Sequence, residues 1–354
     1  MRSELRIGIV GAGQFTRARH LPGLLALPGV RVAAVCDLRR ETAARVAREF
    51  DIPKVHGSWE DLVEDDTIHA VIIGAWPNLH CPVTLAALDA GKHVLTADRM
   101  AMNAREAQRM YDSAREHPKQ TAMIVPSPYG LVGDPFMRSL IAHGFLGKLR
   151  EVHVHGFSSG LADPKTPLSW RQVTKYVGFN MLSLGELYEV VLRWAPPASH
   201  VSAYARRLIP NRLDPESGQP TRVGSPDSVQ VVTVQEDGSC GTYRISGVVW
   251  HNTGAGIALY GSEGTLSYDL TRDEIWGARR DESALRLMPI PGELRGGWQV
   301  EADFIAAIRG ERPVTRTDFA TGVRSMQFTE AVARSSRHQS LVTLPLSEFS
   351  NPSL

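Results

Sequence analysis

The chain of 354 residues is poor in cysteine, has no excess of charge of either sign and contains no long apolar run. Its three cysteines, Cys36, Cys81 and Cys240, are scattered and form neither the close pairs of a zinc site nor a disulfide framework. We therefore expect no metal site and a reducing, cytoplasmic location. The first apolar strand begins at about the fifth residue, which leaves no room for a signal peptide. No run of about 18 apolar residues is present that could cross a bilayer.

The charges are balanced and mixed along the chain. Lysine and arginine number 39, aspartate and glutamate number 38, and the net charge is +1. A protein that binds nucleic acid or an anionic membrane usually carries a basic patch, so we expect neither partner. The length and a hydrophobic content of 43% suit two globular domains.

A glycine turn near the N-terminus is the most informative motif. It reads Gly11-Ala12-Gly13-Gln14-Phe15 and stands between an apolar strand and a helical run, and the next apolar strand ends on Asp37. This order is typical of a dinucleotide-binding site. Gly11 permits the tight turn, Gly13 has no Cβ to hold a pyrophosphate off the backbone, and the N–H groups that open the helix face the phosphates.

The acid at the end of the second strand favours NAD as the cofactor. The Asp37 carboxylate can accept hydrogen bonds from both ribose hydroxyls of the adenosine, and it would repel a 2′-phosphate. Arg39 and Arg40 follow directly, so NADP is not excluded. Thr16 replaces the third glycine of the motif, a position that serves packing of the helix on the strand rather than phosphate contact.

The hydrophobic pattern predicts an α/β protein whose N-terminal domain, residues 1–122, has a Rossmann fold. Strand and helix patterns alternate through this part, which favours a parallel, doubly wound sheet with its ligand at the carboxyl ends of the strands. The expected helices lie over 41–50, from Ser58, over 82–90 and from Asn103 to 116, and the expected strands over 69–74, 92–96 and 120–125.

The second domain, residues 123–354, is expected to be an α+β domain with a mostly antiparallel, open sheet. This domain is expected to bind the substrate and to form the contacts of the oligomer. Expected helices span 134–143, 178–194, 297–309 and 318–337, and expected strands include 149–156, 228–235, 241–249, 256–260 and 264–268. The polar stretch 211–224 is expected to be an exposed loop.

Three further segments give the chain a family resemblance. They are Ala87-Leu88-Asp89-Ala90-Gly91-Lys92-His93-Val94-Leu95, Gly144-Phe145-Leu146-Gly147-Lys148-Leu149 and the closing Pro313-Val314-Thr315-Arg316-Thr317-Asp318. With the glycine turn, they resemble the glucose–fructose oxidoreductase / inositol dehydrogenase (Gfo/Idh/MocA) family. The resemblance implies a Rossmann domain with a C-terminal open-sheet domain, and hydride transfer between NAD(P) and a sugar, polyol or related alcohol. It also implies a homo-dimer or homo-tetramer formed through the open sheet face.

The chain departs from that family where the chemistry is expected. Members usually carry Glu-Lys-Pro where this chain has Ala97-Asp98-Arg99, and Asp-x-Gly-x-His where it has Ser183-Leu184-Gly185-Glu186-Leu187. Residues 183 and 187 should share one helix face, which Asn180 joins. Oxidation of an alcohol needs a group that accepts the hydroxyl proton. The resemblance implies that the usual lysine, aspartate and histidine are absent while the dinucleotide site is kept.

The remaining candidates follow from position at a strand end or in the expected cleft. Replacement acid/base groups are Asp98, Tyr176 and Glu186, with Lys175 and Tyr188 as further possibilities, against the interpretation that these are solvated or supporting residues. His80 either contacts the cofactor or is a helix-start residue satisfied by backbone. Beyond the glycine turn and Asp37, expected cofactor contacts are Ala75, Trp76, Asn78, His80 and Ala97; expected substrate contacts are Arg99, Trp170, Arg171, Asn180, Ser183 and Leu187.

Three functions remain open from the sequence. The first is an NAD(P)-dependent oxidoreductase acting on a sugar, polyol or keto-sugar with a relocated acid/base group. The second is a non-redox sugar enzyme in which bound NAD assists elimination, epimerisation or glycoside cleavage. The third is a non-catalytic sensor for a nucleotide or sugar, because the usual chemical groups are missing. We rank the oxidoreductase first, although fold alone does not establish chemistry.

Overall fold

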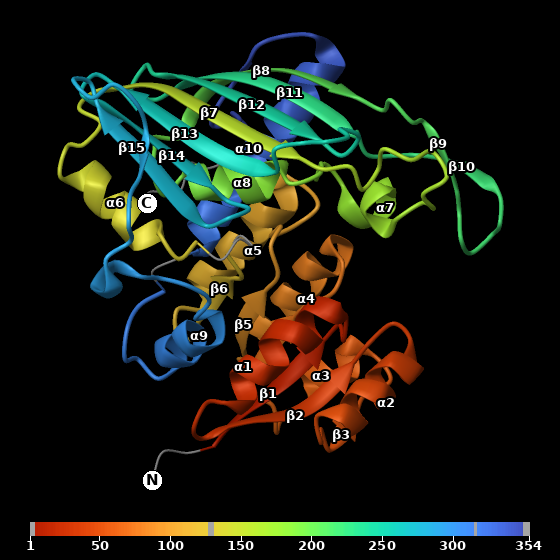
Figure 1. The fold of residues 1–354 in the computed structure, drawn as a ribbon. Coiled ribbons are helices and arrows are strands. Elements are labelled where there is room, and N and C mark those ends of the chain that lie inside the picture. The colour runs from red at the N-terminus through yellow and green to blue at the C-terminus, as the bar shows by residue number, and fades with distance from the viewer. Residues whose placement is uncertain (1–3, 127–130, 315–316, 350–354) are drawn as a thin grey trace. The chain divides into compact units, whose positions relative to one another are not determined.

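The computed structural model describes residues 4–126, 131–314 and 317–349 (Figure 1). The chain forms two compact units. The first contains residues 1–126, 299–326 and 352–354, and the second contains residues 127–298 and 327–351. The sequence placed residues 299–326 in the second domain. Their contacts place them in the first unit, because Phe319, Val323 and Met326 pack in one apolar cluster with Met110 and Ile124.

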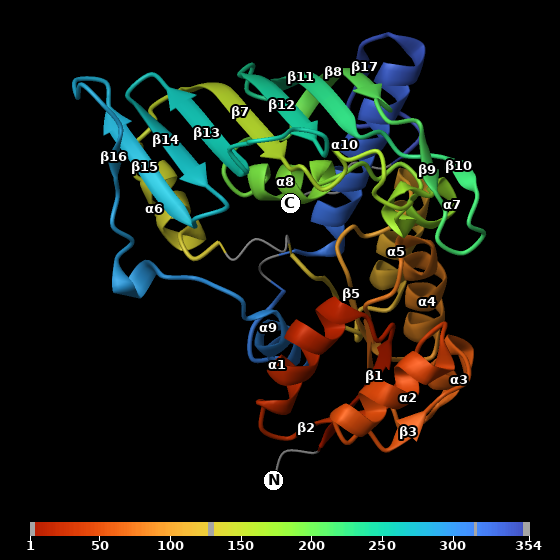
Figure 2. The ribbon, with the colours of Figure 1, turned by 45° about the vertical axis from the view of Figure 1, so that its right-hand side comes forward.

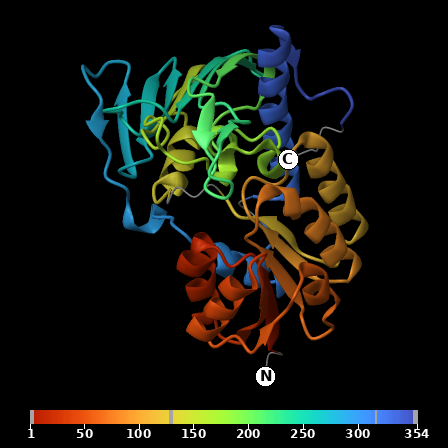
Figure 3. The same ribbon diagram turned by 90° about the vertical axis from the view of Figure 1, so that its right-hand side faces the viewer.

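The first unit has a six-stranded parallel sheet in the order β3-β2-β1-β4-β5-β6, and helices lie on both of its faces (Figure 3). The strands are β1 Leu5–Val10, β2 Val30–Cys36, β3 Lys54–Val55, β4 Ala70–Ile73, β5 His93–Thr96 and β6 Ala122–Ile124. The helices are α1 Leu21–Leu25 with a π-helical turn η1 Thr16–His20 before it, α2 Arg40–Glu49, α3 Trp59–Glu64, α4 Pro77–Asp89, α5 Ala104–Glu116 and α9 Val300–Ile308. The predicted doubly wound sheet is confirmed, and its strand order reverses between β1 and β4.

Local signals set most helix starts in this unit. The Ser58 hydroxyl accepts a hydrogen bond from the Asp61 N–H at 3.1 Å, and the Asn103 side chain accepts one from the Glu106 N–H at 2.9 Å. Both caps were predicted. The predicted start of α4 at Pro82 is wrong, because the helix begins at Pro77 and includes Pro82 in its interior. Pro77 suits the first helical position, where the backbone N–H has no partner within the helix. Pro82 removes one backbone hydrogen bond from the helix.

The second unit has a nine-stranded, mostly antiparallel sheet in the order β16-β15-β14-β13-β7-β12-β11-β8-β17 (Figure 2). Within this sheet, β7 and β12 form the only parallel pair of described strands. The strands are β7 Leu149–Phe157, β8 Ala198–Arg206, β11 Ser228–Gln235, β12 Cys240–Ser246, β13 Ala255–Gly261, β14 Gly264–Asp269, β15 Glu274–Arg279, β16 Arg286–Leu287 and β17 Val342–Thr343. The expected open sheet is confirmed.

Helices cover one face of this sheet. They are α6 Asp134–Ala142, α8 Leu184–Val191 and the later part of α10 Phe319–His338, whose Phe328 stacks on Tyr188 with ring centroids 3.7 Å apart (Figure 2). No helix of the described residues covers the other face. Shorter elements are η2 Trp170–Gln172, α7 Thr174–Val177, η3 Gly292–Leu294 and the hairpin β9 Asn211–Leu213 with β10 Pro220–Arg222. The stretch 211–224 is therefore not a plain loop, since two short strands pair within it.

The helix predicted over 178–194 is shorter in the structure, where α8 spans only Leu184–Val191. The helix α7 ends at Val177, and α8 begins only at Leu184. Two residues between them adopt positive φ, Gly178 at 61° and Leu182 at 47°. Asn180 therefore does not share a helix face with Ser183 and Leu187, because the chain around it is not helical.

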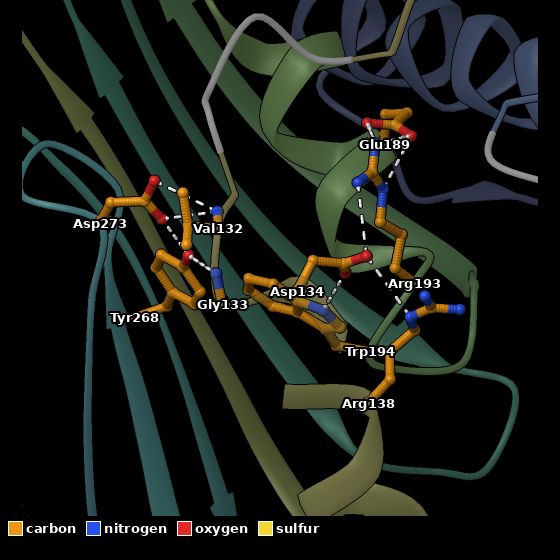
Figure 4. A network of polar contacts seen from close by, with 9 residues as sticks. All are labelled: Val132, Gly133, Asp134, Arg138, Glu189, Arg193, Trp194, Tyr268 and Asp273. Atoms are coloured by element: carbon orange, nitrogen blue, oxygen red, sulfur yellow. Dashed lines mark hydrogen bonds and ion pairs between the residues drawn. The ribbon is translucent and has the colours of Figure 1, made fainter. Parts of the chain in front are cut away.

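A buried polar network fixes the start of α6 to the end of α8 (Figure 4). The indole N–H of Trp194 donates to the Asp134 carboxylate at 2.9 Å, and the Arg193 guanidinium lies 3.8 Å from the same carboxylate. Arg193 also pairs with Glu189, with a shortest contact of 2.7 Å, while the exposed Arg138 lies 3.4 Å from Asp134. Asp134 is thus the acceptor that the buried members of the network share.

On the other side, Tyr268 holds the residues that lead into α6 (Figure 4). The Tyr268 hydroxyl donates to the Asp273 carboxylate and accepts a hydrogen bond from the Gly133 N–H at 2.8 Å. The Asp273 carboxylate also accepts from the Val132 N–H at 3.0 Å. Burial, together with the bond to Asp273, raises the pKa of Tyr268, so its hydroxyl stays protonated as a donor.

Replacing Asp134 tests how much this network contributes to the free energy of unfolding. Asp134→Ala leaves the buried Trp194 N–H without its acceptor and Arg193 with one carboxylate fewer, so we expect the free energy of unfolding to fall by about 2–3 kcal/mol. Arg138→Ala removes only the exposed partner and should change it by less than about 0.5 kcal/mol. Urea unfolding of both variants measures the difference. Equal, small effects would show that the network does not stabilise the fold.

Candidate functional site

The glycine turn has the geometry that a bound diphosphate requires. Gly11 has φ of +94°, and a Cβ built there would lie 2.6 Å from the Ala75 nitrogen, so the fold itself demands glycine. A Cβ on Gly13, in contrast, would meet nothing within 4 Å. Gly13, Gln14 and Phe15 are exposed. Since no described residue fills the space in front of Gly13, the turn fits a group that approaches the backbone from outside.

Thr16 shows how the third glycine of the motif is replaced. Its side chain is buried, and the hydroxyl donates to the Gly11 carbonyl at 2.9 Å. A Cβ on Gly74, at the end of β4, would lie 2.3 Å from that hydroxyl. The close packing of helix on strand is therefore kept, with the glycine on the strand side and the larger residue on the helix side.

The Asp37 carboxylate accepts hydrogen bonds both from the glycine turn and from the loop that follows it. Its Oδ2 accepts a hydrogen bond from the Ala12 N–H at 2.8 Å, and its Oδ1 accepts one from the Arg39 N–H at 3.0 Å. The residue is half-buried. Each carboxylate oxygen keeps a second lone pair, so both can still accept from ribose hydroxyls. Arg39 and Arg40 are exposed beside it.

The buried His80 joins the turns that follow β4 and β5. Its Nε2 lies 3.0 Å from the Ala75 carbonyl oxygen, and its Nδ1 lies 2.9 Å from that of Arg99. Burial lowers the pKa of His80, although the two carbonyls oppose this shift. Both ring nitrogens therefore face backbone carbonyl oxygens, and a neutral imidazole donates to only one of them. His80 therefore holds together the two turns at the carboxyl ends of β4 and β5. Ala75, Trp76 and Asn78 are half-buried at the start of α4.

The stretch Ala97-Asp98-Arg99 continues directly from β5. The Ala97 N–H donates to the Ile73 carbonyl at 2.9 Å, and the Asp98–Arg99 peptide bond is cis. Asp98 is half-buried, whereas Arg99 is only 8% exposed. Asp98 thus occupies the carboxyl edge of the sheet, on the same edge as the glycine turn, because β1 and β5 are parallel strands of one sheet.

In the second unit, Trp170, Arg171 and Tyr176 lie on two adjoining short helices. The Arg171 guanidinium stacks 4.3 Å from the Trp170 ring centroid, and the Lys175 ammonium lies 4.7 Å from the ring centroid of Tyr176. A hydrogen bond with the Tyr176 side chain raises the pKa of Lys175. The structure therefore gathers two aromatic–cation pairs within η2 and α7.

The other predicted substrate residues face the interior of the second unit. Asn180 is 2% exposed and donates through its amide to the Val177 carbonyl at 2.8 Å. A Cβ built on Gly156 of β7 would lie 2.7 Å from Leu187 and 2.9 Å from the Ser183 hydroxyl, so both side chains pack on the sheet. Their expected role as a helix face toward a substrate is not supported. Glu186, on the same helix, stays partly exposed.

A residue pair that the sequence did not indicate supports the glycine turn. His20 Nδ1 lies 2.6 Å from Glu301 Oε1, with both side chains buried, and Phe15 packs edge-on to His20 with ring centroids 5.3 Å apart. The pair ties η1 to α9. The two residues are 281 positions apart, so no local pattern could have joined them.

The described ranges contain neither a metal-binding cluster nor a membrane-spanning helix. No group of three or more histidine, cysteine, aspartate or glutamate side chains there is arranged to hold a metal ion. Within the same ranges, no helix combines the length and apolar character needed to cross a bilayer. Candidate residues are therefore found in each unit separately: the glycine turn and strand ends in the first, and the η2–α7 segment in the second.

Two family models match the sequence. The oxidoreductase family model with an NAD-binding Rossmann fold, Gfo/Idh/MocA, matches residues 5–125, and a C-terminal domain model of the same family matches residues 136–267. The chain belongs to the Gfo/Idh/MocA family. The predictions of family, NAD cofactor and NAD(P)-dependent oxidoreductase class are confirmed.

Several relatives of this chain are named as dehydrogenases. Levoglucosan dehydrogenase of Pseudarthrobacter phenanthrenivorans is 25% identical over 97% of this chain and 98% of its own length. Inositol 2-dehydrogenase of Salmonella agona is 31% identical over 46% of this chain and 49% of its own. Trans-1,2-dihydrobenzene-1,2-diol dehydrogenase of Sus scrofa is 32% identical over 51% of this chain and 52% of its own.

Solved structures share the whole fold. Levoglucosan dehydrogenase in complex with NADH and L-sorbose superposes with a TM-score of 0.86 at 23% identity, covering 96% of this chain and 99% of that one. An oxidoreductase domain protein from Kribbella flavida gives 0.87 at 20% identity, covering 97% and 100%. At these identities the match establishes the fold.

A single methyl group tests the glycine turn. Gly13→Ala adds a Cβ that meets no protein atom but enters the space expected for the pyrophosphate. We expect the free energy of unfolding to change by less than about 1 kcal/mol, while NAD affinity falls at least tenfold, or about 1.4 kcal/mol. Calorimetric titration with NAD measures this. Gly292→Ala, whose Cβ also meets open space, is the matched control and should bind NAD normally. Unchanged affinity in Gly13→Ala would place the diphosphate elsewhere.

Proposed function

We propose that this protein oxidises a CH–OH group of a sugar or polyol with NAD(P), or reduces the corresponding keto-sugar. The observation that carries the proposal is the open space in front of Gly13 within an otherwise closely packed glycine turn. The names of relatives such as levoglucosan dehydrogenase and inositol 2-dehydrogenase support a carbohydrate-like substrate. In this proposal, residues 1–122 form the NAD domain, with α9 and the start of α10 completing its packing, and the rest forms the substrate and oligomerisation domain.

The proposed dinucleotide contacts all lie at the carboxyl edge of the six-stranded sheet. The bound nicotinamide supplies the hydride acceptor. The chain supplies the phosphate-facing N–H groups, the ribose-facing Asp37 carboxylate and the walls of the strand-end turns. The residues assigned to direct contact are Gly11, Ala12, Gly13, Gln14, Phe15, Asp37, Ala75, Trp76, Asn78 and Ala97.

The proton of the substrate hydroxyl needs an acceptor other than the usual lysine. Asp98 occupies that lysine position, but a carboxylate is a weak base near neutral pH. The Tyr176 side chain has the Lys175 ammonium as its hydrogen-bond partner. The ammonium lies 4.7 Å from the Tyr176 ring centroid, so Tyr176 is a phenol beside a cation, one of the side-chain types that serve as general acid or base. We therefore assign the acid/base role to Tyr176 ahead of Asp98 and Glu186, with Trp170 and Arg171 as substrate contacts.

Conservative variants separate the three candidates. Tyr176→Phe keeps the ring and removes the hydroxyl, so kcat should fall roughly a hundredfold or more, as loss of a general base requires, without a change in NAD affinity. Asp98→Asn and Glu186→Gln should lower kcat by less than about tenfold. The assay follows NADH absorbance with a panel that includes levoglucosan, inositol and keto-sugars. A larger loss in Asp98→Asn would reassign the base. NAD binding without turnover on any substrate would contradict the oxidoreductase proposal and favour a sensor.

We also propose that the uncovered sheet face joins two copies of the chain. Large apolar side chains stand on that face with about two to three fifths of their surface exposed: Tyr204 52%, Val232 57%, Val234 40%, Tyr260 39% and Trp276 36%. On β11, β13 and β15 each of them follows a buried residue, and Tyr204 of β8 pairs in register with the exposed Gln230 of β11, so they share one side of the sheet. An apolar face of this kind suits a two-fold, self-complementary interface.

A charge in the middle of the face tests the dimer. Val232→Glu should convert the oligomer to monomers, because each interface would bury two carboxylates related by the two-fold axis. Leu25→Glu, at an exposed leucine of α1, is the control and should leave the mass unchanged. Light scattering coupled to size-exclusion chromatography gives the mass. A wild-type monomer, or a Val232→Glu variant of unchanged mass, would contradict the proposed interface.

A further inference from the structure

Arg212 is buried in a segment that the sequence indicated as an exposed loop. It lies on β9 and is only 2% exposed. Its guanidinium donates to three backbone carbonyls: those of Asp163 at 2.9 Å, Thr166 at 3.0 Å and Leu161. No carboxylate within the described residues pairs with it. Arg212 is thus a buried cation whose hydrogen-bond acceptors are the backbone carbonyls of one turn.

A buried guanidinium without a carboxylate is costly, and an apolar residue of similar size would usually be cheaper for stability. Its planar fork of donors, however, can bind several carbonyls at once in a fixed arrangement. The three carbonyls that it binds belong to residues 161–166, a turn that lies outside the regular helices and strands. The interaction therefore specifies the shape of that turn.

The turn leads directly to the pair Trp170-Arg171, and the hairpin that carries Arg212 also holds the far end of the segment. The Leu168 N–H donates to the Leu213 carbonyl at 2.8 Å. The Gln172 carbonyl accepts from the N–H groups of Gly224 at 2.8 Å and Ser225 at 3.2 Å. Figure 2 shows β9 and β10 beside α7 at one end of the sheet. Residues 161–172 are thus fixed at both ends by residues 212–225.

We propose that Arg212 is a positioning residue for substrate recognition: it holds the 161–172 segment so that Trp170 and Arg171 present one fixed surface to the substrate. This inference rests on the proposed substrate role of that pair. The hairpin acts on the neighbouring α7 as well. Besides the hydrogen bond with Tyr176, the nearby charges of Glu216 and Asp214 raise the pKa of Lys175.

Variants at Arg212 and at a second arginine of the same hairpin separate positioning from charge. Arg212→Met removes the donors and keeps an apolar stem, and Arg212→Lys keeps the charge with fewer donors in place. Arg222→Met is the control, since Arg222 lies on β10 and is exposed. Hydrogen–deuterium exchange reports the amides of 161–172, and steady-state kinetics gives KM and kcat for the sugar and the affinity for NAD.

In Arg212→Met we expect amide exchange in 161–172 to rise at least about tenfold. The sugar KM should rise roughly ten- to a hundredfold, because a displaced pair no longer fits the substrate. NAD affinity should stay within about twofold, since the variant leaves the glycine turn intact. Arg212→Lys should fall between Arg212→Met and wild type, and Arg222→Met should match wild type. A merely structural role would lower stability without this split between KM and NAD affinity.

The outcomes distinguish this inference from the proposed function. Unchanged exchange in 161–172 overturns the positioning role of Arg212, whatever the enzyme turns over. Faster exchange with an unchanged KM shows that the segment is held by Arg212 but does not recognise the substrate, which overturns the link made here. If Arg212→Met fails to fold, as judged by circular dichroism and a melting curve, the same two criteria apply to Arg212→Lys. If wild type turns over no sugar, the proposed function fails, and the exchange comparison still decides whether Arg212 holds the segment.

Discussion

The approach of the Gly11 backbone to the end of β4 is the constraint on which the first unit depends. A Cβ at Gly11 would lie 2.6 Å from the Ala75 nitrogen, and one at Gly74 would lie 2.3 Å from the Thr16 hydroxyl. Two glycines on neighbouring segments therefore let strand, turn and helix meet closely, with the Thr16 side chain packed between helix and strand. The Asp37 carboxylate then closes the arrangement by accepting from the Ala12 N–H. What remains uncovered is the outward side of Gly13, where a ligand can reach the backbone.

Two buried histidines support the segments around this turn. His80 joins the carbonyls of Ala75 and Arg99 beneath the strand ends, and His20 joins η1 to Glu301 on α9. These partners engage both ring nitrogens of His80 and Nδ1 of His20. The two histidines thus hold in place the segments that carry the expected contact residues, as supporting residues do in binding sites.

Local patterns in the sequence were sufficient for much of the fold. The glycine turn, the caps at Ser58 and Asn103 and the alternating strands such as β11 each rest on neighbouring residues, and each was predicted. The break before α8 was not, because positive φ at Leu182 is imposed by surrounding structure rather than by its own preference. Buried Arg212 was missed for a related reason. Its partners, at residues 161–166, lie some fifty positions away along the chain, and composition alone marks an arginine in a polar stretch as exposed.

The contribution of α9 to the first unit has a consequence for how the protein is made. The helix that follows the glycine turn is anchored by Glu301, which the ribosome adds only after more than four fifths of the chain. During synthesis His20 therefore lacks its carboxylate partner until the strands of the second unit from β7 to β16 have been made. The first unit completes its packing on α9 only after that point, although its six strands are all made earlier.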